Sequence, residues 1–288
     1  MMATSAPLPI TIHTAEVRLG NPRELVLGLV TDIARSRHIA WEMMKRDLKS
    51  QYRTSILGVL IPILPALTTA AWAILFRDAH LINVGAVNMP YPFFVLCGMM
   101  LWAAFLESMD APISGVLTEQ ALLSKADVPA ESVTIARIGL VFFNFGVKSL
   151  IIIAAAIFYR VHVPWTIVLA PIGLVLMVSL GAAIGLILAP INLLYSDVAR
   201  ALPVVTTFWF FTTPIIFTTP THGLAGVIMR DLNPVTPLLT TTRELAFGSG
   251  LSMPAGLEIT TALTLCLLAI GLIFHRIAMP IVIDRANV

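Results

Sequence analysis

The feature that most constrains this chain is a series of long apolar runs that recur along most of its length. They cover about residues 56–76, 90–115, 138–158, 166–189, 201–219 and 259–279. Because the hydrocarbon core of a bilayer is about 30 Å thick, about 20 apolar residues make one helical crossing. The runs therefore predict an all-α, polytopic membrane protein with six transmembrane helices.

The composition agrees with this prediction and leaves no room for a second globular domain. Hydrophobic residues make up 58% of the 288 residues and charged residues only 12%, whereas a soluble domain carries about 25% charged residues. We divide the chain into a cytosolic N-terminal tail with an amphipathic interface helix (1–55), a transmembrane domain (56–279) and a short cytosolic tail (280–288).

The N-terminal segment has two parts. Residues up to about 20 show no periodicity, but from Glu24 to His38 apolar side chains recur every four positions, as at Leu25, Leu29 and Ile33. This spacing predicts an amphipathic helix on the membrane surface. The surface helix of a soluble domain would show the same pattern, and the apolar runs that follow favour the membrane.

The distribution of Lys and Arg predicts the orientation of the spans. The N-terminal segment is rich in both, and further basic residues follow the second, fourth and last runs. The opposite connections contain few of them, namely Arg77, Arg160, Arg230 and Arg243. Because positive residues remain preferentially on the cytoplasmic side, we predict that both termini are cytoplasmic.

The connection over residues 220–257 differs from an ordinary polar loop. It contains the apolar stretch Leu224 to Met229 and the sequence NPVTPLLTTTRELAFG, both too short to cross a membrane. Such pieces suit re-entrant helices, which are tolerated where protein or water covers the backbone. A folded extracytoplasmic cap is the alternative.

Three ionisable residues fall within or near the apolar runs. Glu107 and Asp110 lie three residues apart and share one helical face, and Lys148 lies inside the third run. Because charges inside a membrane line a cavity or pair with one another, we predict that Lys148 contacts Glu107 or Asp110. An ion pair that only fixes helix packing is an equally good interpretation of this set.

Chemistry-bearing motifs are few. The sequence contains no Gly-rich phosphate loop, no metal-ligand cluster and no nucleophile motif. It therefore predicts no catalytic or metal-binding residues and no enzyme activity in this chain. Gly181 and Gly185 form a small-xxx-small pair that permits close helix approach. Four consecutive aromatic residues, from Phe208 to Phe211, point all round one helix, and they suit either core packing or a pathway.

Four segments in a fixed order resemble the permeases of type-2 ABC exporters, in particular those for O-antigen and other lipid-linked polysaccharides. They are Lys45–Leu67, Leu117–Ile138, Ile191–Phe217 and Asn233–Gly248. The last contains the Asn-Pro-x-Thr-Pro element that precedes the sixth span in that family. Two features depart from the pattern: Ala126–Pro129 lacks an aromatic residue before its proline, and Lys148 is not expected.

The resemblance implies the membrane subunit of an ATP-driven exporter in the bacterial inner membrane, which serves lipopolysaccharide biosynthesis. It implies a homodimer that assembles with a separate nucleotide-binding subunit, where ATP and Mg²⁺ bind, so this chain itself would carry no cofactor. Its substrate would be a lipid-linked glycan, and its surroundings membrane lipids; no nucleic acid is expected.

The resemblance also implies two sets of site residues. In that family the N-terminal helix and the loop after the second span contact the ATPase, and the matching positions here are Arg46, Asp47, Lys49, Gln120, Lys125 and Asp127. A channel lined partly by aromatic side chains would use Trp72, Phe208, Trp209, Phe210 and Phe211.

Three alternatives remain open from the sequence. An ABC permease for a drug or small lipid shares the six-span plan. A secondary transporter driven by ions could move protons through Glu107, Asp110 and Lys148. An integral-membrane enzyme acting on polyprenyl lipids would need a carboxylate cluster, for which Glu107 and Asp110 are the candidate pair.

Overall fold

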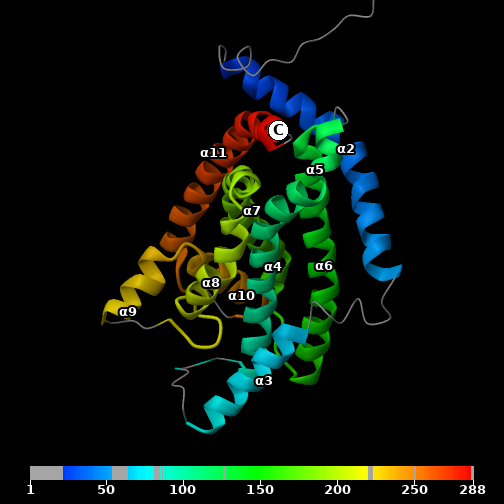
Figure 1. Ribbon diagram of the computed structural model, residues 1–288. Helices are drawn as coiled ribbons and strands as arrows, with labels where there is room; N and C mark the ends of the chain where they lie inside the picture. The colour runs from blue at the N-terminus through cyan, green and yellow to red at the C-terminus, as the bar shows by residue number, and fades with distance from the viewer. Residues whose placement is uncertain are drawn as a thin grey trace, which may run out of the picture.

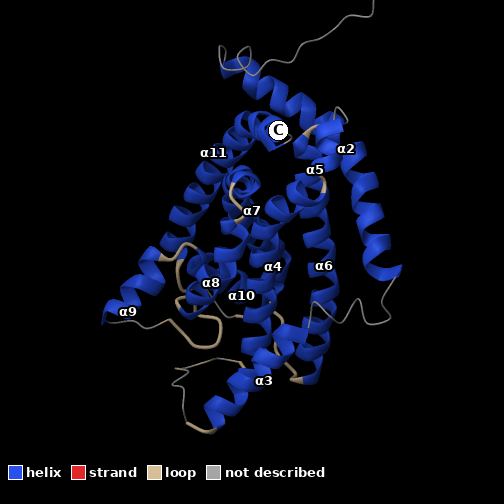
Figure 2. Cartoon of the chain, in the orientation of Figure 1, coloured by secondary structure: helices blue, strands red, loops and turns tan. Residues whose placement is uncertain are grey.

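The computed structural model describes residues 22–53, 64–80, 85, 87, 89–125, 128–219, 223–248 and 251–286, and within these ranges every regular element is a helix (Figures 1 and 2). The helices are α2 (Pro22–Arg53), α3 (Leu64–Asp78), α4 (Tyr91–Thr118), α5 (Gln120–Lys125), α6 (Ala130–Phe158), η1 (Trp165–Leu169), α7 (Ala170–Leu194), α8 (Asp197–Phe211), α9 (Gly223–Val227), η2 (Ile228–Leu232), α10 (Val235–Phe247) and α11 (Pro254–Ala286).

Four helices in the described ranges are long and apolar enough to cross a membrane. They are Tyr91–Thr118, Ala130–Phe158, Trp165–Leu194 and Pro254–Ile283, and they coincide with the predicted second, third, fourth and sixth spans. The all-helical character predicted from the apolar runs is thus confirmed for the described residues, and four of the predicted spans correspond to candidate membrane-crossing helices.

The other two predicted spans stay predictions. The first, at 56–76, falls partly on residues 54–63, which lie outside the described ranges, and continues into the 15-residue helix α3. The fifth, at 201–219, corresponds to α8, another 15-residue helix, followed by irregular backbone. Fifteen helical residues cover about 22 Å, less than the thickness of the hydrocarbon core.

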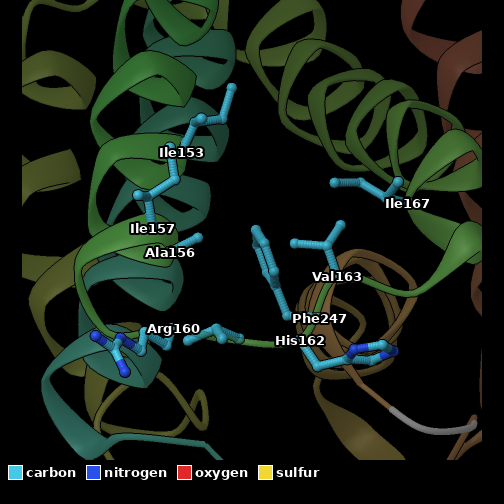
Figure 3. A pocket seen from close by; sticks show the side chains of 9 residues that line it. Ile153, Ala156, Ile157, Arg160, His162, Val163, Ile167 and Phe247 are labelled. Carbon is cyan, nitrogen blue, oxygen red and sulfur yellow. The ribbon is translucent and has the colours of Figure 1, made fainter.

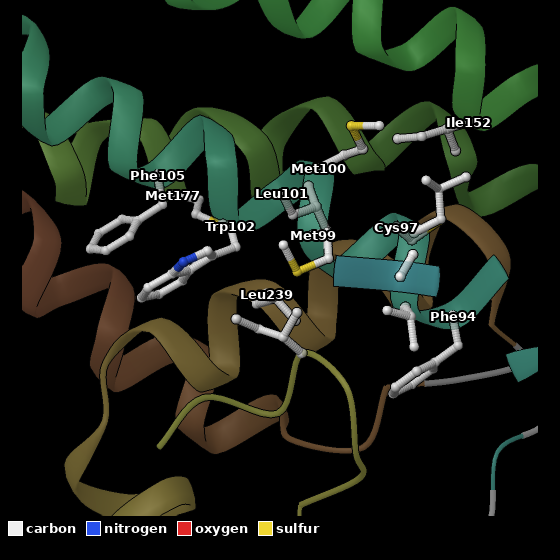
Figure 4. Close-up of a cluster of buried hydrophobic side chains, with 14 of the residues drawn as sticks. Phe94, Cys97, Met99, Met100, Leu101, Trp102, Phe105, Ile152, Met177 and Leu239 are labelled. Atoms are coloured by element: carbon white, nitrogen blue, oxygen red, sulfur yellow. The ribbon is translucent and has the colours of Figure 1, made fainter. Parts of the chain in front are cut away.

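Helix α4 forms the centre of the bundle and packs against α6, α7 and α3 (Figure 1). Its side chains Met100, Trp102 and Phe105 are almost completely buried, and they meet Met177 of α7 and Leu239 of α10 (Figure 4). Burial of apolar surface among these helices gives α4 a fixed position from which the other elements can be located.

The α4–α7 contact depends on small residues. A Cβ atom at Gly181 would collide with the Ser108 hydroxyl and lie 2.6 Å from the Phe105 carbonyl oxygen, and one at Gly185 would collide with the Met109 carbonyl oxygen. The two glycines therefore let the backbones of α4 and α7 approach closely, the arrangement that a small-xxx-small pair permits.

Helices α6 and α11 form the outer part of the bundle. Both present large exposed apolar side chains, including Leu150 and Ile157 on α6 and Ile259 and Leu265 on α11. An apolar exterior of this kind suits contact with lipid tails or with another protein chain rather than water.

Helix α2 is longer than the predicted amphipathic segment and continues without a break from Pro22 to Arg53. The side chains before Ser36 lie outside the description, so the predicted membrane-facing stripe from Leu25 to Ile33 is not described. Beyond Ser36, α2 packs against α6, where Met44 lies against Gly139. The second half of α2 is therefore part of the helical bundle. It starts at the end that also holds α5 and the C-terminal end of α11, and it runs from there alongside α6 (Figure 1).

The segment between α8 and α11 folds into short pieces inside the bundle. Helix α10 packs against α7, η1, α11 and α4. Leu238 and Leu239 are completely buried, and Arg243 is 5% exposed, with its guanidinium 3.7 Å from the Phe94 ring centroid. Although the sequence places Arg243 in an exterior connection, its side chain lies in the interior of the bundle.

Candidate functional site

A network of charged side chains fastens α2 to the start of α6 and to the junction between α4 and α5. Arg46 on α2 forms an ion pair with Glu119, the residue between α4 and α5. It also contacts Asp47 at 3.0 Å, and Asp47 in turn lies 3.4 Å from Arg137 Nε on α6. We call these four residues the coupling network, after the predicted role of Arg46 and Asp47, which stays a prediction.

Exposure differs strongly within the coupling network. The side chains of Asp47 and Glu119 are 15% and 11% exposed, whereas that of Arg46 is 52% exposed. The hydrogen bond to Glu119 raises the pKa of Arg46 above its ordinary value. Arg46 therefore holds its own helix in place while a large part of its side chain remains free to meet another molecule.

Two of the other predicted coupling residues, Lys49 and Gln120, have side chains that the structure describes. Lys49 is exposed and Gln120 is half-buried at the start of α5. Lys125 ends α5, its side chain lies outside the description, and Asp127 lies outside the described residues. Sequence reasoning missed Glu119 and Arg137, although both fall in the segment Leu117–Ile138 that carries the resemblance.

A second contact at the same end of the bundle joins its last and third long helices. Arg276 of α11 lies 3.4 Å from Glu131 in the first turn of α6, and both side chains are largely buried. Together with the coupling network, this pair links α2, α6 and α11 to the segment after α4.

An ion pair also lies between α4 and α6, deep in the bundle. Lys148 Nζ contacts Glu107 Oε1, with 1% of the lysine side chain and 29% of the glutamate side chain exposed. Asp110 lies one turn further along α4 and is exposed. The structure thus brings Lys148 and Glu107 together and leaves Asp110 at the surface. Because Glu107 lies eleven residues before the end of α4, the pair is about 16 Å from that end.

The predicted aromatic set divides into two groups. Trp209 packs edge-to-face on Phe105 with ring centroids 5.3 Å apart, and Phe210 packs on Trp102 at 6.1 Å. In contrast, Phe208 and Phe211 on α8 and Trp72 on α3 are 71%, 58% and 59% exposed. Trp209 and Phe210 therefore join the core, and the three exposed rings are the ones available to a partner or a pathway.

The Asn-Pro element has a structural function that its sequence does not reveal. Asn233 Nδ2 donates to the Thr212 carbonyl at 3.0 Å and to the Thr213 hydroxyl at 2.9 Å. Its Oδ1 accepts from Trp209 Nε1 at 2.9 Å and from the Val235 amide at 3.0 Å. Asn233 thus joins the end of α8 to the start of α10. Its side chain forms hydrogen bonds with backbone groups at the point where α8 has ended and α10 begins.

The depth of this junction follows from its neighbours on α4. Trp209 packs against Trp102 and Phe105, so Asn233 lies beside the middle of α4, about 17 Å along it from Tyr91. At its other end, α10 places Phe247 edge-to-face on Phe93 at 4.8 Å, near the first turn of α4. Helix α10 therefore runs from the middle of the bundle back to the end where α4 begins.

The fold and these contacts define a multi-pass helical membrane protein with a polar network at one end and an ion pair in its interior. Within the described ranges, no group of three or more His, Cys, Asp or Glu side chains is placed to hold a metal ion.

Comparison with known proteins places this chain near bacterial export permeases. It is 27% identical over 226 residues to the O-antigen export system permease protein RfbA of Myxococcus xanthus, covering 77% of this chain and 85% of that protein. It is 23% identical over 206 residues to the protein of the same name from Klebsiella pneumoniae, covering 69% and 76%. No family model matches the chain. These relatives confirm the resemblance to O-antigen export permeases of the type-2 ABC class that four ordered segments indicate.

Proposed function

We propose that this chain is the transmembrane permease subunit of an ATP-driven ABC exporter that moves a lipid-linked polysaccharide, of O-antigen type, across the inner membrane. The similarity to two O-antigen export permeases over more than two thirds of the chain carries this proposal. The relatives' names indicate a transport subunit rather than an enzyme. Because the sequence contains no phosphate-binding loop, ATP and Mg²⁺ would bind a separate ATPase partner.

The proposed arrangement has six spans and both termini in the cytoplasm. Helices α3 and α8 would supply parts of the first and fifth spans. Neighbouring apolar residues within 56–76 and 201–219 would complete them. The end of the bundle that holds α2 and the coupling network would face the cytoplasm, with residues 1–55 and 280–288 as its cytosolic segments. This orientation agrees with the high density of basic residues in the N-terminal segment.

Contacts of α10 support a re-entrant segment before the last span. Its N-terminal junction at Asn233 lies at the depth of Trp102, and its last residue, Phe247, lies at the depth of Phe93. A helix that starts in the middle of a membrane needs partners for its backbone groups. The four hydrogen bonds of Asn233 supply such partners on both sides of the junction.

The coupling network would transmit the movement of the ATPase to the spans. ATP binding closes the two partner subunits, and α2 together with the α4–α5 junction moves with them because Arg46 and Glu119 hold the two segments together. Two copies of this chain would enclose a hydrated path for the glycan. The path would need to be hydrated, since the hydroxyl groups of a sugar chain would be costly to leave unsatisfied in hydrocarbon. The exposed side chains of Trp72, Phe208 and Phe211 are candidates to line it.

The test is to co-express the tagged chain with the ATPase from the neighbouring reading frame, purify the complex and measure ATP hydrolysis in lipid together with glycan export. We expect a stable complex. Arg46→Glu should reduce ATP-dependent export, and combining it with Glu119→Arg should restore export in part, because the ion pair forms again in the opposite sense. Arg200→Glu is the matched control, since Arg200 is highly exposed and its one ion pair among the described residues is with Asp197 on its own helix.

Other results would redirect the proposal. Absence of an ATPase partner and of any ATP dependence would contradict it and favour the ion-driven carrier, for which Glu107 and Lys148 are the observed candidate pair. Export of a small lipid or drug without glycan export would keep the ABC permease and replace its substrate.

A further inference from the structure

A pocket lies at the end of the bundle opposite the coupling network, where α6 turns into η1. Its volume is about 530 Å³, within the range of about 300–1,000 Å³ typical of ligand pockets. The walls are apolar, with Ile153, Ala156 and Ile157 from α6, Ile167 from η1 and Phe247 from α10 (Figure 3). A hydrocarbon chain is the kind of group that such walls accommodate.

The two polar side chains that line the pocket are those of an arginine and a histidine. Arg160 and His162 lie at one end of it, and Ile153 lies at the other (Figure 3). None of the described residues that line the pocket is acidic. The Arg160 guanidinium also forms no ion pair with another described residue. An anion at this mouth would therefore meet positive charge without a competing carboxylate.

The backbone at Arg160 is unusual. The Arg160 amide donates to the Ile157 carbonyl and the Val161 amide to the Ala156 carbonyl, which is the Schellman pattern of a helix end. Arg160 occupies the position where glycine is the usual residue, and its φ is +52°. A left-handed conformation is disfavoured for side chains with a Cβ atom. An arginine here is not explained by the turn, and an outlier of this kind points to a function of its side chain.

Aromatic residues mark the level of the pocket mouth. Tyr159 and Trp165 flank it in sequence and are 36% and 79% exposed. Tyrosine and tryptophan concentrate where a membrane protein passes the lipid headgroups. In a bilayer at this level, the apolar part of the pocket would lie toward the hydrocarbon, along the last turns of α6, and Arg160 would lie at the level of the lipid phosphates.

We infer that this pocket binds an anionic phospholipid of the surrounding bilayer, with one acyl chain against the walls and the phosphate on Arg160, whose guanidinium points away from His162 (Figure 3). Phosphate and guanidinium form strong charge-assisted hydrogen bonds. The site uses neither the coupling network nor the proposed glycan path. The inference that it binds a lipid is therefore independent of the proposed export function.

The experiment measures lipid retention by the purified full-length chain with native mass spectrometry. The probes are phosphatidylglycerol, diacylglycerol with the same chains, and inorganic phosphate. We expect phosphatidylglycerol to bind about tenfold more tightly than diacylglycerol, since one hydrogen bond between charged groups is worth about a factor of ten. Millimolar inorganic phosphate should not displace the lipid. A phosphatidylglycerol with a photoreactive acyl chain should label residues 153–167.

Arg160→Gly separates binding from folding, because glycine suits the left-handed position and should leave the thermal midpoint unchanged or higher. We expect this variant to bind phosphatidylglycerol no better than diacylglycerol. Arg230→Gly removes another exposed arginine outside the pocket and should retain the wild-type preference. The inference is overturned if Arg160→Gly keeps that preference, if both variants lose it equally, if phosphate alone displaces the lipid, or if the label falls outside 153–167.

Discussion

The ion pair between Lys148 and Glu107 yields the sharpest stability prediction. Lys148→Met leaves the Glu107 carboxylate without its cation at a site where that side chain is only 29% exposed. Removing one partner of a buried pair costs about 3–5 kcal/mol, and partial exposure of Glu107 places the loss near the lower end, at about 3 kcal/mol. Glu107→Gln should lower the free energy of unfolding by more than Lys148→Met does, because the Lys148 side chain, then without its partner, is 1% exposed.

A double variant completes the test. Glu107→Gln combined with Lys148→Met leaves no buried charge, so we expect its free energy of unfolding to return to within about 1 kcal/mol of wild type. Equilibrium unfolding in mixed detergent and SDS micelles gives the three values. Asn144→Leu, one turn away on α6, controls for a general effect of changing a polar residue there.

The same variants separate the two interpretations of the pair. If the double variant is stable and still exports glycan, the pair fixes helix packing; if it is stable but inactive, the charges take part in transport. Equal stability of wild type and Lys148→Met, or a double variant as unstable as the worse single one, would refute the reasoning from burial.

Three further predictions follow from other contacts. Gly185→Ala should destabilise the protein by about 2 kcal/mol, because its Cβ would collide with backbone of α4; Gly146→Ala, where a Cβ meets nothing within 4 Å, should be neutral or stabilising by up to about 1 kcal/mol in the same unfolding assay. Asn233→Ala should lower the free energy of unfolding by about 2–4 kcal/mol, since it orphans buried donors and acceptors, and an unchanged midpoint would contradict the junction described for it. Limited proteolysis should cut α2 faster in Arg46→Glu than in wild type, and equal cleavage rates would show that the coupling network does not hold this helix.

Much of the architecture could be predicted because hydrophobic length is a strong signal in a membrane protein. The runs at 90–115, 138–158, 166–189 and 259–279 correspond to four long helices. The run at 201–219 predicts one continuous span because apolar residues predominate in it and no charged residue interrupts it. In the structure α8 ends at Phe211, and the following Thr212–Thr213–Pro214 segment leaves the helix, with its polar groups held by Asn233. Composition alone does not show where an apolar helix stops if another segment forms hydrogen bonds with the polar groups at its end.

Individual site residues were less predictable, because they depend on contacts between distant segments. Lys148 and Glu107 could be matched by depth, since each lies at a definable distance along its own span. Glu119 and Arg137 could not, because their partners on α2 lie more than 70 residues away in sequence and no periodicity links them. The aromatic run from Phe208 to Phe211 predicts rings that point all round one helix, in core packing or along a pathway, and only the contacts with Trp102 and Phe105 identify the rings that pack in the core.

If two copies of this chain enclose a path for a glycan as proposed, the distribution of strong contacts limits where that path can open. Helices α4 and α7 touch through Gly181 and Gly185, and α4 and α6 are joined by the Lys148–Glu107 pair, so separating either pair would expose backbone or a charge. Helix α8 differs, because one face carries exposed apolar side chains, including Val204 and Phe208, and its end is irregular. A path that opens along this face would leave the α4–α6–α7 contacts intact. Export should therefore be blocked by a cross-link that fixes α8 to a second copy, and tolerate one that fixes α4 to α7.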